Sequence, residues 1–400
     1  MAHFPLSGRC IPLWAMITPA DRLKTVEEYY FSRKLKEVRQ MIAEGKPVIN
    51  LGIGNPDLPP PPAVVERLQS AVAEEGVHGY QPYQGIAELR EAMVAWMYRM
   101  YGTQWEAATQ VLPLMGSKEG IFHISMAFLN PGDVVLMPDP GYPTYAAVSR
   151  LVGAEAMTYP LGAENDWQID LAALSALPLD RVKLMWLNTP HMPTGQVQQE
   201  ETLRGLIALA QQHNFLIVND NPYSLILSEE PKSIFQVPGA KDICLELNSL
   251  SKSHHMPGWR VGWLTGNEHL LSTVLQVKSN QDSGMFKAVQ LAAVEALNTP
   301  MEWHASQNQV YAGRKAAALR LLDALGCTPI PNQQGMFVWA KVPEGEESAE
   351  AFADRLLYTH HVFMPPGTIF GEGGKGYIRV SLCVPEGNYE EVISRVTKRT

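Results

Sequence analysis

A single lysine lies in a segment whose other residues could bind a phosphate group. Within residues 249–262, Ser249 and Ser251 come shortly before Lys252, and Arg260 follows the lysine by eight positions. A lysine amine can form a Schiff base with a carbonyl carbon, and hydroxyl and guanidinium groups can hold a phosphate dianion. The segment therefore predicts a site for a cofactor that carries both a carbonyl group and a phosphate. A surface loop with one lysine and one arginine is the alternative.

The composition is that of a globular protein. The chain has 400 residues, of which 46% are hydrophobic and 18% charged, and 32 basic against 41 acidic residues give a net charge of −9. A chain of this length exceeds a single core, so we expect two subdomains. The absence of a basic run argues against a nucleic-acid partner, and no apolar run reaches the ~20 residues of a membrane span.

The N-terminal residues and the cysteines predict a cytoplasmic protein. The stretch Met1–Trp14 has one arginine, two prolines and no long apolar core, so we do not expect a secretory signal. The cysteines lack the spacing of a metal or redox motif, which predicts reduced thiols and no metal site. They are Cys10, Cys244, Cys327 and Cys383.

Short apolar runs that alternate with helix-length segments predict an α/β fold. The runs are continuous rather than alternating, which is typical of parallel strands covered by helices on both faces. They are Val134–Met137, Val182–Leu187, Phe215–Val218 and Ile243–Leu247. The last part of the chain changes to a smaller α+β pattern, with helices expected near 309–325 and 348–358 and strands at 335–342 and 377–381.

These changes in pattern divide the chain into three parts. Residues 1–48 form an N-terminal arm whose amphipathic helix, near 21–45, is expected to pack on the small domain. Residues 49–288 form the large domain, which begins with a loop rich in glycine and proline, and residues 289–400 form the small C-terminal domain.

Polar side chains follow three of the apolar runs where each strand is expected to end. Asn188 follows the run 182–187, Asp220 and Tyr223 follow 215–218, and Ser249 and Lys252 follow 243–247. Ligands bind at the carboxyl ends of strands in an open α/β sheet, so these side chains should line one crevice.

Several segments together resemble a known enzyme family over nearly 90% of the chain, from about Pro47 to the C-terminus. They are Gly52-Ile53-Gly54-Asn55-Pro56-Asp57, Tyr80 with Gly85-Ile86 and Leu89-Arg90, Gly116-Ser117-Lys118, Pro140-Gly141-Tyr142-Pro143, Pro193-Thr194-Gly195, Asp220 to Tyr223, the lysine segment, and Gly376-Tyr377-Ile378-Arg379. The chain resembles the class I/II aminotransferases, fold-type I enzymes similar to aspartate aminotransferase. This resemblance implies a mostly parallel seven-stranded sheet in the large domain, a smaller α+β domain, and pyridoxal 5′-phosphate as the cofactor.

The resemblance also implies roles around the cofactor ring. Lys252 would form the Schiff base and, once freed by the substrate, would move the proton at the substrate's Cα. Asp220 would face the pyridine nitrogen and keep it protonated, because a protonated ring is an electron sink. Tyr223 would hydrogen-bond the cofactor's phenolic oxygen, and Tyr142 would stack on the ring.

A glycine-led turn before the apolar helical run 121–129 predicts the phosphate site. The free N–H groups and the positive end of the dipole at such a helix N-terminus attract a phosphate. With the residues of the lysine segment this turn would form a phosphate cup. The expected members are Gly116, Ser117, Lys118, Ser249, Ser251 and Arg260.

Three further positions follow from the resemblance. Tyr80 matches a tyrosine that reaches the phosphate bound by the neighbouring subunit, which implies a homodimer with shared active sites. Arg379 would hold the substrate's α-carboxylate, since its planar fork suits a carboxylate bidentately. Gly54 is assigned to the substrate as well.

One position departs from the family pattern. Met192 stands directly before Pro193-Thr194-Gly195, where the family usually has an asparagine that contacts the phenolic oxygen. A thioether cannot donate a hydrogen bond. Either Asn188, which we include among the cofactor-binding residues, or His191 supplies this contact, or Tyr223 makes it alone.

The expected function is amino transfer from an L-amino acid to a 2-oxo acid in two half-reactions, a ping-pong mechanism. A β-lyase or a decarboxylase on the same fold is the first alternative, and a cofactor-binding regulator domain is the second. A dinucleotide-dependent dehydrogenase is excluded, since no Gly-x-Gly-x-x-Gly motif opens a strand–helix unit in the first part of the chain. The substrate pair stays open. Segment 278–286 contains no arginine that could hold a second carboxylate, although Lys278 and Asn280 could contact a polar side chain.

Overall fold

The computed structural model describes residues 17–25 and 30–398. The N-terminal stretch expected not to be a secretory signal, and part of the proposed arm, therefore lie outside the described residues. The helix expected near 21–45 corresponds to a short 3-10 helix, η2 (Asp21–Thr25), and to helix α1 (Tyr30–Ala43). Within the described residues, no helix is long and apolar enough to cross a lipid bilayer.

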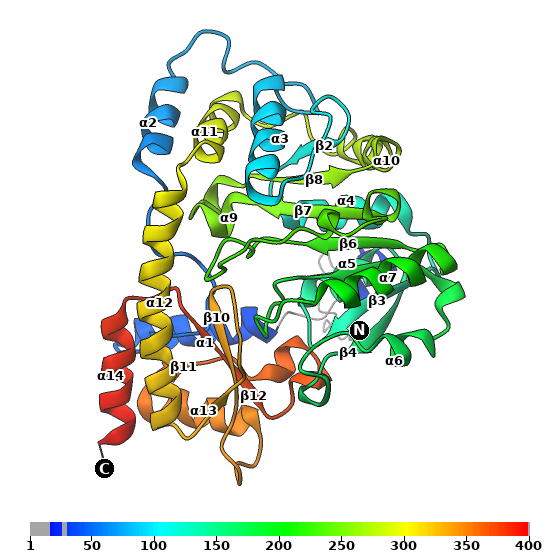
Figure 1. Ribbon diagram of the computed structural model, residues 1–400. Helices are drawn as coiled ribbons and strands as arrows, with labels where there is room; N and C mark the ends of the chain where they lie inside the picture. Colours follow the sequence, from blue (N-terminus) through cyan, green and yellow to red (C-terminus); the bar gives the residue numbers. More distant parts are fainter. Residues whose placement is uncertain (1–16, 26–29, 399–400) are drawn as a thin grey trace, which may run out of the picture.

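A seven-stranded sheet forms the centre of the larger part of the molecule (Figure 1). Its strand order is β2-β8-β7-β6-β5-β3-β4, and β8 runs antiparallel to both of its neighbours while the other pairs are parallel. The mostly parallel α/β sheet expected from the sequence is thus confirmed. The strands are β2 (Val111–Leu114), β3 (Val134–Asp139), β4 (Glu155–Pro160), β5 (Val182–Leu187), β6 (Leu216–Asp220), β7 (Cys244–Ser249) and β8 (Gly262–Gly266).

The four continuous apolar runs form the central strands β3, β5, β6 and β7. Strands β2, β4 and β8 were not predicted. Edge strand β4 is largely exposed, edge strand β2 contains Pro113, and β8 begins and ends with glycine, so each lacks the continuous apolar pattern.

Helices cover both faces of this sheet. In β5, Leu184 and Trp186 pack with one buried cluster, which includes Ile121 of α4, while Met185 and Leu187 pack with the other. Because both faces are buried, the strand needs apolar side chains at successive positions. The surrounding helices are α2 (Pro62–Ala71), α3 (Ala87–Tyr101), α4 (Ser117–Phe128), α5 (Pro143–Leu151), α6 (Leu171–Ser175), α7 (Glu200–His213), α8 (Ala240–Ile243), α9 (Leu250–Ser253), α10 (Glu268–Lys278) and α11 (Lys287–Leu297).

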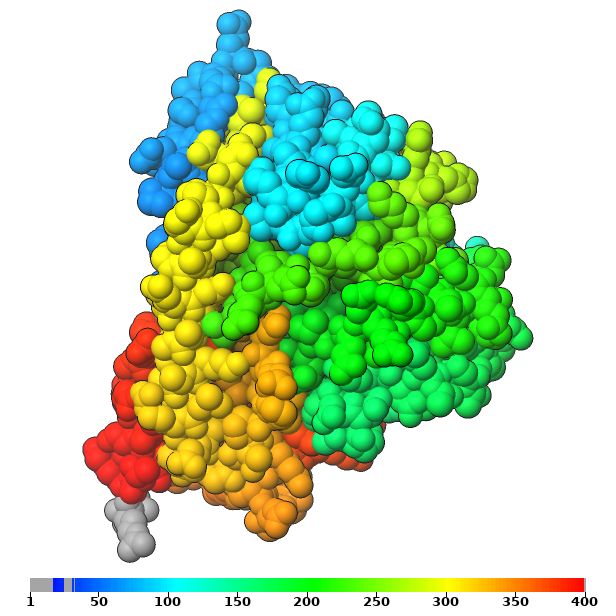
Figure 2. Space-filling model, in the orientation of Figure 1, coloured from blue at the N-terminus to red at the C-terminus, as the bar shows by residue number. Residues whose placement is uncertain are grey.

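The C-terminal part contains an antiparallel sheet of order β12-β10-β9, flanked by helices. A long helix, α12, runs along one side of the molecule and connects the two parts, as the space-filling view also shows (Figure 2). The elements are α12 (Met301–Ala324), β9 (Thr328–Pro329), β10 (Phe337–Lys341), α13 (Ala349–His360), β11 (Val362–Phe363), β12 (Tyr377–Ser381) and α14 (Glu386–Thr397). Short 3-10 helices are η3 (Ala163–Asn165), η4 (Leu179–Arg181), η5 (Ile234–Gln236), η6 (Pro257–Trp259), η7 (Gly367–Phe370) and η8 (Glu372–Gly374).

Helix α1 packs against this C-terminal part. Val38 and Met41 form a small buried cluster with Leu357 and Phe363, and Lys34 Nζ lies 2.9 Å from a carboxylate oxygen of Asp354. Strand β1 (Ile49–Asn50) then pairs in parallel with β11. The chain therefore passes from α1 to the large sheet through the contact region of the two parts.

The loop that follows β1 is held by Arg314 of α12. The two Nη atoms of Arg314 lie 2.6 and 2.8 Å from the two carboxylate oxygens of Asp57, and Nη1 also donates to the Leu382 carbonyl at 3.0 Å. The side chain of Arg314 is only 4% exposed. This bidentate pair fixes the loop 51–57, which carries Gly52 and Gly54.

We predict that Arg314→Met lowers the free energy of unfolding by about 2 kcal/mol, because it removes charge-assisted hydrogen bonds from a partly buried carboxylate. Arg320→Met is the matched control, since Arg320 lies on α12 like Arg314 and pairs with Glu390 of α14, but both side chains of this pair are more than half exposed. The control should lose less than ~1 kcal/mol. Urea unfolding of both variants measures the difference, and equal losses would contradict a special role for the Arg314 pair.

Candidate functional site

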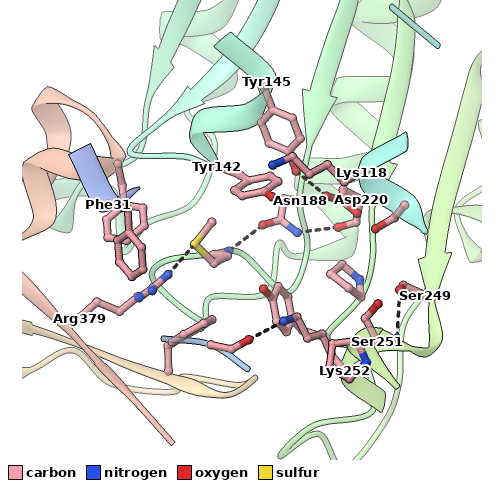
Figure 3. A pocket seen from close by; sticks show the side chains of 18 of the residues that line it. Phe31, Lys118, Tyr142, Tyr145, Asn188, Asp220, Ser249, Ser251, Lys252 and Arg379 are labelled. Atoms are coloured by element: carbon pink, nitrogen blue, oxygen red, sulfur yellow. Dashed lines mark hydrogen bonds between the residues drawn. The ribbon is translucent and has the colours of Figure 1, made fainter. Parts of the chain in front are cut away.

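The carboxyl ends of the central strands and the loop 51–57 surround one pocket of about 280 Å³ (Figure 3). Most of the residues predicted from the sequence line it, although they come from segments far apart in the chain. The predicted residues in its wall are Gly54, Ser117, Lys118, Tyr142, Asn188, Asp220, Tyr223, Ser249, Ser251, Lys252, Arg260 and Arg379. The expectation that the strand ends share one crevice agrees with this arrangement.

Lys252 lies on the single turn of α9, directly after β7. Its Nζ donates a hydrogen bond to the carbonyl oxygen of Gly54 at 2.5 Å. Burial, together with the positive charges of Arg379 and Arg260, lowers the pKa of Lys252 below its usual value. The amine is therefore more easily deprotonated than a surface lysine, which is the state a nucleophile or a general base requires.

Asp220 ends β6 and is buried. Its Oδ2 accepts a hydrogen bond from the Tyr145 hydroxyl at 2.9 Å, while Oδ1 is buried without a hydrogen-bond partner among the described residues. Burial raises the pKa of Asp220 to about 6, and the Tyr145 hydrogen bond opposes this rise. A buried carboxylate oxygen without a donor is suited to receive one from a ligand.

Two aromatic rings are fixed beside Asp220. Tyr145 stacks on Trp186 with 5.0 Å between ring centroids, and Tyr142 packs edge-on against Tyr145 at 5.5 Å. Tyr142 directly precedes α5, and its ring lines the pocket next to Asn188 (Figure 3). The contacts with Tyr145 hold the plane of the Tyr142 ring, so that a flat ligand could stack on it.

The end of the pocket formed by the N-terminus of α4 and the turn after β7 has the features of an anion site. Gly116 precedes the 12-residue helix α4 with a φ of 93°, and a methyl group at this position would lie 2.0 Å from Nη2 of Arg260. The glycine therefore allows the guanidinium group to approach the N-terminus of the helix. Ser117, Lys118, Ser249 and Ser251 line the same end. Gly116 itself does not line the pocket and acts through the space that it leaves for Arg260.

Both the nitrogen and the oxygen of the Asn188 side-chain amide form hydrogen bonds within the protein. Its Nδ2 donates to the Asp220 carbonyl at 2.5 Å, and its Oδ1 accepts from the Met192 N–H at 2.7 Å. Nδ2 carries a second hydrogen, so Asn188 can still donate to a ligand. His191 is not among the residues that line the pocket. Its Nδ1 lies 2.8 Å from the Thr194 hydroxyl instead. Burial lowers the pKa of His191 to about 3.

Arg379 lies on β12 and reaches the pocket from the C-terminal part. Its Nη2 donates to the Gly52 carbonyl at 2.7 Å, and its Nη1 donates to the Met192 sulfur at 3.2 Å. The side chain is buried, at 5% exposure. Tyr223 packs edge-on against Phe337, the ring that also contacts Arg379, and burial raises the pKa of the Tyr223 hydroxyl.

Tyr80 is the predicted site residue that lies away from the pocket. Its side chain is 93% exposed and faces a separate depression formed with residues 283–286. Within one chain, therefore, Tyr80 does not join the other predicted residues.

Several residues of the site were missed at the level of sequence. Tyr145 lies one helical turn after Tyr142, and this spacing was the one available signal. Phe31, Phe337 and Phe370 line the pocket around Arg379, but each looks like an ordinary core residue in its own segment. Their place in the site follows only from the packing of α1, β10 and η7.

A second polar cluster lies outside the pocket. Ligand-type atoms of Glu119, His123 and Asp282 lie within 4.8 Å of one another, although the sequence predicted no metal site. Nζ of Lys278 lies 2.8 Å from Asp282 Oδ2 and donates to the Tyr83 carbonyl, so this cluster already contains a cation. Lys278 is only 2% exposed, which removes it as a candidate contact for a substrate side chain.

Comparisons with known proteins show the family to which the chain belongs. The family model "Aminotransferase class I and II" matches residues 46–396. An LL-diaminopimelate aminotransferase from Aquifex aeolicus is 40% identical over 379 residues, which cover 94% of this chain and 98% of that protein. The substrate-bound BacF structure from Bacillus subtilis is 35% identical, with a TM-score of 0.89 over 96% of this chain and 97% of that chain.

A probable N-succinyldiaminopimelate aminotransferase from Thermus thermophilus is 31% identical, with a TM-score of 0.85 over 92% of this chain and 98% of that chain. A mutant aspartate aminotransferase from the same organism has a TM-score of 0.89 at 26% identity, over 95% of this chain and 99% of that chain. The family model and these relatives span almost the whole chain. The protein belongs to the class I and II aminotransferases, which are pyridoxal 5′-phosphate-dependent enzymes.

Proposed function

We propose that this aminotransferase moves an amino group from an L-amino acid to a 2-oxo acid with Lys252, Asp220 and Arg379 as its principal site residues. The observation that carries this assignment is their convergence in one pocket. A buried amine with a lowered pKa, a buried carboxylate oxygen without a donor, and a buried guanidinium group surround the same space.

The pocket residues fit pyridoxal 5′-phosphate. The anion site formed by Gly116, Ser117, Lys118, Ser249, Ser251 and Arg260 would hold the phosphate, and Oδ1 of Asp220 would accept a hydrogen bond from a protonated ring nitrogen. Tyr142 would stack on the ring, and Tyr223 and Asn188 would donate to its phenolic oxygen. When bound, the cofactor supplies an electron sink for bonds at the substrate's Cα.

Lys252 and Arg379 have complementary tasks in this proposal. The Nζ of Lys252 would hold the cofactor and then take the proton from the substrate's Cα, which the lowered pKa of this amine favours. Arg379 would hold the α-carboxylate through charge-assisted hydrogen bonds. Because a held carboxylate stays on the substrate, the arrangement favours cleavage of the Cα–H bond over decarboxylation.

The assembly and compartment are part of the same proposal. Tyr80 is exposed in the single chain, which suits a residue that reaches the phosphate bound by a partner subunit in a homodimer.

The described cysteines, Cys244, Cys327 and Cys383, are buried free thiols, which suits the cytoplasm. We further propose that the chain is divided into an N-terminal arm (1–48), a large domain (49–288) and a small domain (289–400). A relative of this chain is named LL-diaminopimelate aminotransferase, so LL-diaminopimelate belongs among the amino donors against which selectivity should be measured.

The assignment of Lys252 predicts where the cofactor attaches. Reduction of the cofactor-loaded protein with borohydride, followed by peptide mapping, should place the modification on Lys252. Lys252→Ala should bind less cofactor and show no such peptide, because it lacks the amine that forms the bond. Modification of Lys118, the other lysine of the described pocket wall, would instead show that the attachment site was assigned wrongly.

The pKa of Asp220 predicts a pH effect on stability. Because this pKa rises from 3.8 to about 6, the free energy of unfolding of the cofactor-free fold falls as pH increases from about 4 to about 6 and then levels off. The loss should be on the order of 3 kcal/mol at pH 7.5, and roughly half of it should already be present at pH 5. A cationic ring nitrogen beside Asp220 would offset it, so the cofactor should raise Tm more at pH 7.5 than at pH 5.

Asp220→Asn is the control for that measurement, since it keeps the shape of the side chain but cannot ionise. The pH dependence of the cofactor-induced Tm gain should be clearly smaller in this variant. An unchanged dependence would mean that other groups, such as the cofactor phosphate, cause it and that Asp220 is not the ring partner.

Shared active sites predict complementation between two inactive subunits. Lys252→Ala and Tyr80→Ala homodimers should each turn over poorly at limiting cofactor. In a mixed dimer, the chain that keeps Lys252 receives the intact Tyr80 of its partner, so one site is complete. Random exchange should restore roughly one quarter of the wild-type activity. No recovery, or a monomer in sedimentation experiments, would contradict action of Tyr80 across the interface.

A further inference from the structure

The end of the pocket around Arg379 is lined by apolar side chains from four different segments. Phe31 comes from α1, Met192 from the loop after β5, Phe337 from β10 and Phe370 from η7. We refer to these four residues as the apolar wall. Figure 3 shows Phe31 and Arg379 together at one end of the pocket, and Ser249 and Ser251 at the other.

The apolar wall packs directly on the guanidinium group. The Arg379 Cζ lies 3.9 Å from the ring centroid of Phe337, 4.6 Å from that of Phe370 and 5.9 Å from that of Phe31. Nη1 donates to the Met192 sulfur, a weak and uncharged acceptor. A substrate whose carboxylate binds Arg379 therefore meets rings and a thioether in the immediate surroundings of this group.

The charges in the pocket are distributed unevenly. Among the described lining residues, the basic ones are Lys118, Lys252, Arg260 and Arg379, and Asp220 is the one acid. Lys118 and Arg260 belong to the anion site near the N-terminus of α4, and Asp220 lies next to Asn188 and Tyr145. Near the apolar wall, the charged residues that line the described pocket are Arg379 and Lys252, whose Nζ donates to the Gly54 carbonyl beside Phe337, so the charges there are cationic.

We propose that the site selects amino acids whose side chain is uncharged and apolar, aliphatic or aromatic. This inference rests on the proposed function, in which Arg379 holds the α-carboxylate. A second carboxylate on the substrate would compete for the same guanidinium group, and a distal ammonium would be repelled by it. Either charge would lose its hydration against rings and a thioether, whereas an apolar side chain gains from leaving water.

The apolar wall does not depend on a partner subunit, since its four residues belong to the same chain as Arg379. Phe31 reaches the pocket because α1 packs against α13 and β11, where its ring lies edge-on to Phe363 with centroids 6.0 Å apart. Phe337 is fixed by β10, where it pairs with Ser381 of β12. The shape of the wall is thus set by the packing of the C-terminal part.

A panel of amino donors tests the selection. We expect kcat/KM in the first half-reaction of the cofactor-loaded protein to be at least tenfold higher for L-phenylalanine, L-leucine and L-methionine than for L-aspartate, L-glutamate, L-lysine and LL-diaminopimelate. A higher value for any of the charged donors would overturn the inference and leave the aminotransferase function intact. Failure of every donor would overturn the proposed function itself.

Binding without reaction gives a second readout. 3-Phenylpropanoate and glutarate both carry a carboxylate but have no amino group to transfer. We expect 3-phenylpropanoate to raise the Tm of the cofactor-loaded protein more than glutarate does at equal concentration, because only its phenyl group can use the apolar wall. A larger effect of glutarate would contradict the inference.

Substitution of Phe31 separates selection from folding. Phe31→Ala should lower kcat/KM for L-phenylalanine about tenfold more than it lowers the value for L-alanine, because the methyl side chain of alanine is too short to gain from the ring, whereas the contact of Phe31 with Arg379 affects both substrates. Phe31→Leu should recover most of the loss. Phe122→Ala is the matched control, as Phe122 is 38% exposed on α4 and outside the pocket wall. Equal losses for both substrates would show that Phe31 only supports the fold, and would overturn its role in selection.

Discussion

The loop 51–57 is the structural constraint on which the site depends, because its carbonyl groups hold both functional cations. The Gly54 carbonyl accepts from Lys252, and the Gly52 carbonyl accepts from Arg379. A methyl group on Gly54 would lie 2.2 Å from the Phe337 ring, so only glycine allows the loop to pass so close to β10. The bidentate pair between Asp57 and Arg314 anchors the end of this loop on α12. The distance between amine and guanidinium is thus set by backbone atoms rather than by mobile side chains.

Burial shifts the pKa values of Lys252 and Asp220 in a direction that favours cofactor binding. Lys252 and Asp220 both lack an ion pair among the described residues, and burial shifts the pKa of each toward the neutral form. Such groups weaken the fold on their own, since their ionised forms are poorly solvated. A ligand that forms a bond with the amine and places a cationic N–H beside the carboxylate offsets both costs. The same property that makes the pocket unfavourable when empty therefore contributes to cofactor affinity.

The two ends of the pocket differ in chemistry because they come from different parts of the fold. The anion site is built on the large sheet, where the N-terminus of α4 and the turn after β7 converge. The apolar wall is built mainly on α1 and the C-terminal part, which can vary without disturbing the strand ends. This separation offers a physical reason why one family can keep its cofactor chemistry and still differ in the amino acids that it accepts.

The sequence by itself determined the central strands and the residues at their ends. Continuous apolar runs specify β3, β5, β6 and β7 because both faces of the sheet are buried, and the polar residues after them must then meet at one edge. The family resemblance supplied the cofactor and the remaining candidate positions. Strands β2, β4 and β8 could not be predicted in this way, because they lack a continuous apolar run. Strand β2 contains a proline, β4 has exposed side chains, and β8 begins and ends with glycine.

Only the tertiary structure decided how these residues act on one another. The hydrogen bond from Tyr145 to Asp220 joins positions 75 residues apart, and the contact of Arg379 with Met192 spans 187 residues. Neither contact leaves a local pattern, because periodicity reports which side of an element is buried and not what is packed against it. The same holds for Phe31, which has the sequence signature of a core residue and the position of a site residue. Long-range packing, rather than composition or spacing, places it beside the guanidinium group.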